Sequence, residues 1–367
     1  MMVKVCIRAD GGKDVGLGHI MRCLSLAQTF RRNGDKVYFF SKLDEGIKKI
    51  RQENFEFVRL VSAVQEADGY LYDNPTHLAD EVSEMIALLQ EYRIDVLVID
   101  TYNVSREYFL ALKPYVNRLA YVDDINKFPY PVDIVINGNI TGKFLGYQKY
   151  DQEQGLFLGT EYNMIRDEFS NIPPRTIRRN VKEILITTGG GDPFKLTSKL
   201  LDILLKDEEY RHLRLNVLVG SGFTNCGNLG DLSKNCDNVF LYANSVLSHI
   251  LPDIIYSEVS PIMLRSDLAI SAGGSTLYEL AACGTPAMAI ILADNQEGIV
   301  HKMDELGYVK SLGWYAQLSE ELVLDNLGKI MGDVQRRREM STKGQRLVDG
   351  KGTERIVRSI LQNFEEN

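Results

Sequence analysis

Short apolar segments alternate with longer segments whose apolar residues recur every three or four positions, nearly throughout the chain. This alternation is typical of β-α-β units, in which helices cover both faces of a parallel sheet. In the first half we expect helices over residues 19–32 and 77–92 and strands over 3–10, 36–43, 95–100, 118–123 and 133–137. In the second half we expect strands over 183–188, 214–220, 238–243, 267–271 and 286–292. The pattern therefore predicts an α/β protein with two parallel sheets.

A segment rich in proline and basic residues, NIPPRTIRRN at 171–180, separates the two series of strands. Each proline lacks a hydrogen-bond donor and restricts the residue before it, which favours a linker. We therefore expect one Rossmann-like domain over 1–170 and a second over 171–367, which suits a chain of 367 residues. A last helix is expected in GTERIVRSILQNF, and we expect it to dock on the body of the protein through one apolar face, formed by Ile356, Val357, Ile360, Leu361 and Phe364.

Charge and cysteine usage exclude several classes of protein. The 42 basic and 50 acidic side chains give a formal net charge of -8, which argues against nonspecific binding of nucleic acid but leaves phosphate-bearing small molecules open. The five cysteines form no Cys-x-x-Cys pair, so we expect free thiols in a reducing compartment. No apolar run approaches 18 residues and no secretory signal is evident, so we expect a cytoplasmic protein without membrane insertion. Nothing in the sequence indicates the oligomeric state.

The loop after the first expected strand presents a histidine at the start of a helix. In ADGGKDVGLGH, Gly16 and Gly18 permit a tight backbone path before His19. A dinucleotide-binding fingerprint would need glycine where Met21 stands, and no P-loop lysine follows. His19 therefore fits either a general base or a structural histidine that begins the helix. Arg22, one turn further on, fits either contact with a phosphate or sugar oxygen or a structural role.

Three loops of the second half carry candidate nucleotide contacts. Asp192 fits a helix cap better than a ligand contact, because Pro193 follows it. Glu279 either completes a capping box with Thr276 or accepts hydrogen bonds from ribose hydroxyls. Amides and side chains that could bind a nucleotide occur in three segments: TTGGGDPF (Gly189, Gly190, Gly191), SAGGSTLYEL (Gly273, Gly274, Ser275, Thr276) and ADNQE (Asn295, Gln296). In the last segment, capping of a helix by Asp294 or Asn295 is equally open.

Polar residues also close three expected strands of the first domain: Asp100 with Tyr102, Asp123 with Asp124, and Asn137 with Asn139. Individually they are ordinary turn residues, and collectively they would form a polar rim. No histidine has a partner at metal-ligand spacing, and no Gly-x-Ser-x-Gly elbow occurs. We therefore expect neither a metal site nor a cofactor.

Six motifs together resemble a known family over nearly the whole chain. They are IRADGGKDVGLGHIMRCLSLA, YVDD, LGTEYNMIRDEF, TTGGGDP, SAGGSTLYELAACGTPAMAIILADNQ and DGKGTERIV. This set resembles the UDP-sugar hydrolases of pseudaminic acid biosynthesis. The GGST turn is shared with the wider glycosyltransferase-B group, including the MurG-like transferases, and spore-coat polysaccharide proteins share these motifs. Residues 231–265 depart from the family pattern, which predicts an altered pocket for the nucleotide base.

The resemblance implies a glycosyltransferase-B-like fold, with two Rossmann-like domains facing a cleft. It implies hydrolysis of UDP-2,4-diacetamido-2,4,6-trideoxy-β-L-altropyranose to UDP and the free sugar, without metal and with inversion, toward surface polysaccharide and flagellin glycosylation. His19 matches the family's proposed base. We assign Gly16, Gly18, Arg22, Asp100, Tyr102 and Asn137 to the sugar, and the three loops with Glu279 to the nucleotide. Two alternatives stay open: a transferase with an acceptor in place of water, and a noncatalytic binder of UDP-sugars.

Overall fold

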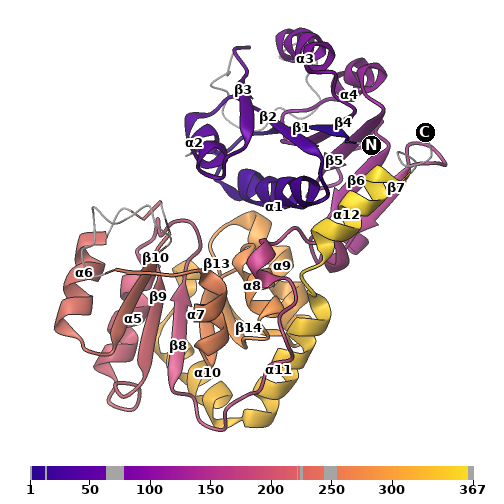
Figure 1. The fold of residues 1–367 in the computed structure, drawn as a ribbon. Helices are drawn as coiled ribbons and strands as arrows, with labels where there is room; N and C mark the ends of the chain where they lie inside the picture. The colour runs from indigo at the N-terminus through magenta and orange to yellow at the C-terminus, as the bar shows by residue number, and fades with distance from the viewer. Residues whose placement is uncertain are drawn as a thin grey trace. The chain divides into compact units, whose positions relative to one another are not determined.

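The structure is a computed structural model that describes residues 2–12, 15–62, 78–220, 222–223, 226–243 and 254–362. The chain divides into two compact units. Unit 1 comprises Met1–Asp167 with Lys351–Asn367, and unit 2 comprises Glu168–Gly350. Each unit is built on its own seven-stranded sheet, in which every paired strand is parallel (Figure 1).

The sheet of unit 1 has the strand order β3-β2-β1-β4-β5-β6-β7. Val5 and Ile7 of β1 face a core shared with α1 and α12, whereas Cys6 between them faces a core shared with α3 and α4. The strands are β1 (Lys4–Ala9), β2 (Lys36–Ser41), β3 (Glu56–Arg59), β4 (Val96–Asp100), β5 (Arg118–Val122), β6 (Ile134–Asn137) and β7 (Gly155–Leu158). The helices are α1 (Gly18–Arg32), α2 (Asp44–Gln52), α3 (Ala79–Tyr92), α4 (Arg106–Leu112) and α12 (Gly352–Leu361).

The sheet of unit 2 has the corresponding order β11-β10-β9-β8-β12-β13-β14. The strands are β8 (Glu183–Thr187), β9 (Arg214–Leu218), β10 (Val239–Ala243), β11 (Ile255–Tyr256), β12 (Leu268–Ala272), β13 (Ala287–Ile291) and β14 (Val309–Trp314). The helices are α5 (Leu196–Lys206), α6 (Cys226–Asn235), α7 (Val259–Arg265), α8 (Thr276–Ala282), α9 (Asp294–Glu305), α10 (Glu320–Gly332) and α11 (Val334–Leu347).

In both sheets the order reverses at one point, between β1 and β4 in unit 1 and between β8 and β12 in unit 2. The connections after these neighbouring strands leave toward opposite sides, which opens a crevice where parallel sheets bind ligands. The loops that follow β1, β4, β8 and β12 carry most of the predicted site residues. The predicted site residues in these loops therefore lie at the strand ends where parallel sheets bind ligands.

All ten predicted strands are present, and both predicted helices of the first half are found as α1 and α3. His77, the expected start of the second helix, lies outside the described residues. Four strands were not predicted, namely β3, β7, β11 and β14, and they are the outer strands of the two sheets. The predicted departure at 231–265 is described only in part, as the end of α6, β10, β11 and α7.

The last helix belongs to unit 1, whereas the sequence-based division placed it in the second domain. Its residues Ile356, Val357, Ile360 and Leu361 join the core that contains α1 and β1. Phe364, predicted on the same face, lies outside the described residues. On the other side of the division, the first unit ends at Asp167 rather than at 170.

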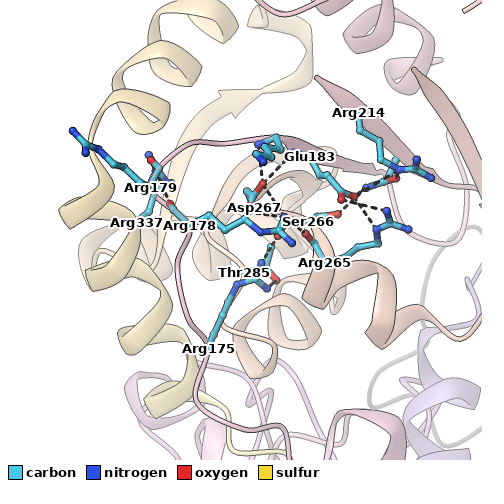
Figure 2. Close-up of polar contacts among 12 residues, drawn as sticks. Arg175, Arg178, Arg179, Glu183, Arg214, Arg265, Ser266, Asp267, Thr285 and Arg337 are labelled. Carbon is cyan, nitrogen blue, oxygen red and sulfur yellow. Dashed lines mark hydrogen bonds and ion pairs between the residues drawn. The ribbon is translucent and has the colours of Figure 1, made fainter. Parts of the chain in front are cut away.

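The segment 171–180 is fastened to unit 2 by two arginines (Figure 2). Arg175 donates to the carbonyl of Met263, at 3.1 Å, and to that of Ser266 near the end of α7. Arg337 of α11 is 1% exposed and donates to the carbonyls of Arg178 and Arg179, at 3.2 and 2.6 Å. The segment expected to be a linker is therefore part of unit 2 and is held on it by hydrogen bonds.

Two further observations bear on the sequence-based expectations. The described residues contain no helix that combines the length and the apolar character needed to cross a bilayer. Cys6, Cys23, Cys236 and Cys283 are free thiols, as their spacing predicts.

Candidate functional site

The first candidate site lies where the sheet order of unit 1 reverses, and His19 is at its centre. Helix α1 begins at Gly18, so the loop after β1 delivers His19 in the first turn. Asp100 ends β4, the neighbouring strand. The two side chains meet with His19 Nδ1 2.6 Å from Asp100 Oδ1. The imidazole is 11% exposed and the carboxylate is fully buried.

Arg22, one turn after His19, joins Asp100 to a second carboxylate. It donates from Nε to Asp100 Oδ2 and from Nη2 to Asp100 Oδ1, both at 2.6 Å. On its other side it donates from Nη1 to Asp124 Oδ1 at 2.8 Å and from Nη2 to Asp124 Oδ2 at 3.0 Å. Four of its five N–H groups are thus committed to two carboxylates. Of the two roles that the sequence left open for Arg22, this geometry favours the structural one.

Each oxygen of the Asp100 and Asp124 carboxylates has two hydrogen-bonding partners from the protein. Asp100 Oδ2 also accepts from the Cys23 thiol at 3.3 Å, and Asp124 accepts from Tyr102 Oη and from Asn139 Nδ2, each at 2.7 Å. Burial alone would raise the pKa of Asp100 and Asp124, but Arg22 outweighs it and holds both below their usual range. Asp100 was expected to bind the sugar, yet it is engaged by protein groups on both oxygens.

This arrangement assigns the tautomer of the imidazole. An ionised Asp100 can only accept hydrogen bonds, so the proton of neutral His19 resides on Nδ1 and the lone pair on Nε2. The Tyr102 ring packs edge-on against the imidazole, with 4.9 Å between ring centroids. A base and the group that orients it are therefore present together.

The remaining sugar-site predictions fall in different places. Gly16 has φ +71° and its carbonyl accepts from Gly12 N at 3.1 Å, which closes the loop before α1, and Gly18 begins the helix. Asn137 is fully buried and donates to Tyr147 Oη at 2.9 Å. Its neighbour Asn139 makes the contact with Asp124 instead. The assignment of Asn137 to the sugar stays a prediction.

A buried ionic network that the sequence did not suggest supports the loop before His19. Asp10, directly after β1, accepts from Ser41 Oγ at 3.1 Å and from Lys42 N at 2.7 Å. Arg8 lies 2.6 Å from Asp10 and donates to Glu81 at 2.7 Å. Burial opposes the ionised form of Glu81, but Arg8 and Lys42 lower its pKa to about 2. The network therefore ties the ends of β1 and β2 to helix α3.

The predicted glycine loops of unit 2 lie against one another at the reversal between β8 and β12. Gly222 N donates to the carbonyl of Gly190 at 2.8 Å. A Cβ atom on Gly220 would lie 2.4 Å from the same carbonyl, so only glycine fits there. A Cβ atom on Gly189 would lie 3.8 Å from Thr276 Oγ1. The 189–191 loop and the 273–276 turn are thus neighbours, as an anion cradle requires.

Asp192 occupies the amino end of helix α5. Its carboxylate is 2% exposed and accepts from Leu196 N at 2.7 Å and from Thr197 N at 3.0 Å. Asp192 thus caps the first amides of α5, as predicted, but the N-cap residue is Lys195, so Pro193 does not lie in the first turn as the Asp-Pro pair predicts. Because these amides are taken, the 189–191 loop does not present a free helix terminus to an anion.

Helix α8 begins at Thr276, which makes Ser275 its cap residue, and the Ser275 side chain makes no capping hydrogen bond. The expected capping box of Thr276 with Glu279 is therefore wrong by one position. Glu279 lies in the first turn. The amides of Leu277 and Tyr278 donate to the carbonyls of Gly274 and Ser275, at 3.1 and 3.0 Å. The amides of Gly274, Ser275 and Thr276 are therefore the candidate anion donors of this turn.

The last predicted loop, ADNQE, also differs from what the sequence predicts. Helix α9 begins at Asp294 with Ala293 as its cap residue, so the expected capping by Asp294 or Asn295 is absent. Gln296 turns back, and its Oε1 accepts from Leu292 N at 3.0 Å. Asn295 is exposed on the first turn. Among the described residues, no group of three or more His, Cys, Asp or Glu side chains is arranged to hold a metal ion.

A matched pair of substitutions tests the packing of the 273–276 turn. A Cβ atom on Gly273 would lie 2.4 Å from Val300 Cγ2, whereas on Gly274 its nearest neighbour would be Gln296 Nε2 at 3.8 Å. We expect Gly273→Ala to destabilise unit 2 by about 1–3 kcal/mol through overpacking. We expect Gly274→Ala to cost about 0.5 kcal/mol or less. Thermal melting of both variants checks this, and equal melting curves would contradict the geometry.

Comparisons with known proteins bear on these sites. No family model matches the chain. It is 27% identical to an uncharacterized protein of Methanocaldococcus jannaschii over 78% of this chain, which spans only 55% of that relative. It is 22% identical to the spore coat polysaccharide biosynthesis protein SpsG of Bacillus subtilis, over 99% of this chain and 98% of the relative. It is 24% identical to the UDP-2,4-diacetamido-2,4,6-trideoxy-beta-L-altropyranose hydrolase of Campylobacter jejuni, over 83% and 98%.

Solved structures agree on the fold. MurG of Acinetobacter baumannii superposes with a TM-score of 0.66 at 15% identity, over 98% of this chain and 99% of that one. The UDP-GlcNAc 2-epimerase of Neisseria meningitidis, solved with UDP-GlcNAc bound, gives 0.62 at 14% identity, over 98% and 100%. The predicted glycosyltransferase-B-like fold is confirmed, and so is the resemblance to these relatives that the motifs indicate.

Proposed function

We propose that this chain hydrolyses UDP-2,4-diacetamido-2,4,6-trideoxy-β-L-altropyranose to UDP and the free sugar, as a step of pseudaminic acid biosynthesis. The likeness to the Campylobacter jejuni hydrolase supports the choice of substrate. The observation that carries the proposal is the contact of 2.6 Å between His19 Nδ1 and the buried Asp100 carboxylate. A histidine oriented in this way is what activation of a water molecule requires.

In the proposed reaction His19 is the general base. Its Nε2 takes a proton from water while the water oxygen forms a bond to the anomeric carbon. The bond between that carbon and the phosphate oxygen breaks, and its electron pair leaves with UDP. A single displacement inverts the anomeric configuration. Asp100 keeps the Nδ1 proton in place and stabilises the imidazolium that forms.

The leaving diphosphate is assigned to unit 2. Main-chain amides of Gly274, Ser275 and Thr276 at the start of α8 would stabilise its negative charge, which is the role that preorganised donors play in such reactions. The amide of Gly273 donates to the carbonyl of Ile290 at 2.9 Å, so Gly273 is assigned only the close packing of the turn. The helix α5 is given no part in this, since Asp192 fills its amino end. Glu279 is assigned to the ribose hydroxyls, and the proposal calls on no metal ion or cofactor.

A glycosyltransferase is the second candidate, supported by the superposition on MurG. It would use the same activated sugar, with an acceptor hydroxyl in place of water. A third candidate, a noncatalytic UDP-sugar binder, would bind the substrate without consuming it.

Incubation with the UDP-sugar in ¹⁸O-labelled water, without any acceptor, separates these candidates. We expect release of UDP and one ¹⁸O atom on the anomeric carbon of the sugar, with the inverted configuration seen first by NMR. Label in UDP would mean attack on phosphorus and would contradict the mechanism. Release of UDP only after an acceptor is added would indicate a transferase, and binding without release would indicate a binder.

A further inference from the structure

We propose that Asp124 is a positioning residue for His19 that acts through Arg22 and Asp100. The inference rests on the proposed function only in naming His19 as the base. Asp124 follows β5, a strand that pairs with β4, and it meets the same face of α1 as Asp100. No sequence motif points to this role, because the three charged residues are far apart in the chain.

The connection is made by one nitrogen. Arg22 Nη2 donates to Asp100 Oδ1 at 2.6 Å and to Asp124 Oδ2 at 3.0 Å, and it lies 3.2 Å from His19 Nδ1. The guanidinium is planar, so its position between the two carboxylates is fixed by both of them. A change at Asp124 therefore moves the cation that borders the imidazole.

Asp124 has no capacity left for a substrate. Oδ1 accepts from Arg22 and Asn139, and Oδ2 accepts from Arg22 and Tyr102. Two lone pairs on each oxygen are thus used. This saturation favours an effect on Arg22 over direct contact with a sugar.

The sign of the effect follows from the charges. Asp100, Arg22 and Asp124 together carry one net negative charge beside the imidazole of His19. Without the Asp124 carboxylate, Arg22 is left to neutralise Asp100 alone, and its positive charge opposes protonation of the imidazole. Loss of this carboxylate therefore makes His19 a weaker base.

Other charged and titratable groups approach this region from neighbouring elements. Tyr102 packs on the imidazole and Cys23 donates to Asp100. Glu45 of α2 borders the loop at Gly12, where its Oε2 would lie 3.3 Å from an added Cβ, and Asp10 precedes that loop paired with Arg8. Of these groups Tyr102 touches Asp124, through the hydrogen bond of 2.7 Å from its hydroxyl, which the amide oxygen of Asp124→Asn can still accept.

Asp123 provides a matched control at the next position. It is fully buried and accepts from Tyr147 Oη and from Asn126 N at 2.6 Å, whereas the carboxylates that Arg22 binds are Asp100 and Asp124. Burial raises its pKa, whereas the pKa of Asp124 is lowered by Arg22 despite burial. Two adjacent aspartates thus differ in the one property that the proposal concerns.

The experiment follows the ¹⁵N-labelled imidazole of His19 by NMR across pH, with its signal assigned by comparison with His19→Asn. In Asp124→Asn we expect the titration midpoint to fall by about one pH unit relative to the parent protein. We expect Asp124→Glu to restore it and Asp123→Asn to leave it unchanged. An unchanged midpoint in Asp124→Asn, or an equal fall in Asp123→Asn, would overturn the proposal.

A second variant keeps the test decisive if Asp124→Asn does not fold. Tyr102→Phe removes only the hydroxyl that donates to Asp124, so this carboxylate attracts Arg22 more strongly. We expect the midpoint to rise by a few tenths of a pH unit, opposite in sign, and a fall would count against the proposal. Since these titrations use no substrate, they remain informative if the hydrolase assay itself fails.

Discussion

The His19→Asn variant is expected to lose about 10²- to 10⁴-fold in kcat while its affinity for UDP stays the same. The size follows from the usual contribution of a general base. Asparagine can still donate an N–H to Asp100 in the place of His19 Nδ1, so the frame around Arg22 persists, but no basic nitrogen remains. UDP release in single-turnover assays and calorimetric titration with UDP measure the two quantities separately.

His212→Asn is the matched control, because His212 is an exposed histidine beside β9 in unit 2. Its kcat should equal that of the parent protein. Undiminished turnover in His19→Asn would remove His19 from the mechanism. A parallel loss of UDP affinity would instead indicate that the substitution disturbs the fold.

The Asp100→Asn variant should show the second large effect, a fall in kcat of about 10²- to 10⁴-fold with KM changed much less. An amide at this position presents an N–H group to His19 Nδ1 or to Arg22, which favours the wrong tautomer of the imidazole. It also leaves Arg22 with one anionic partner, so we expect a loss of about 3–5 kcal/mol in stability. Steady-state kinetics and denaturant unfolding distinguish these two consequences.

Asp95 offers a control on the same strand. It precedes β4, at the end opposite to Asp100, and its carboxylate accepts from Lys4 N at 2.9 Å. Asp95→Asn should cost stability but leave kcat unchanged. If Asp100→Asn kept the parent kcat, orientation of His19 by Asp100 would be excluded as a catalytic factor.

The central part of both sheets was predictable from the sequence because central strands are buried on both faces. β4 and β12 are buried at every position and read as continuous apolar runs. The outer strands lack this signal: β3 has no buried residue and β7 is half-buried throughout. An outer strand has one neighbour, and its side chains are only partly covered, so hydrophobicity alone does not reveal it.

The candidate site was predictable in part. Features with a local sequence signal were predicted, and contacts between residues distant in the chain were not. His19 was found because glycines and a helix start surround it locally in the sequence. The pairing of Arg22 with Asp124 joins residues 102 positions apart, and the sheet order decides it. Asp192 was correctly assigned to capping, but α5 begins three residues later than the Asp-Pro pair predicts, with Lys195 as its N-cap residue. The cap of α8 was misplaced by one residue, within the usual uncertainty of helix ends.

Helix α12 completes the core of the unit that the ribosome makes first. Ile356 and Ile360 are fully buried there, so the apolar surface of α1 and β1 that they cover stays open during synthesis of unit 2. A nascent chain must therefore carry a partly uncovered first unit while the 183 residues of unit 2, Glu168–Gly350, are made. The same connectivity means that a fragment ending before α12 would be prone to self-association.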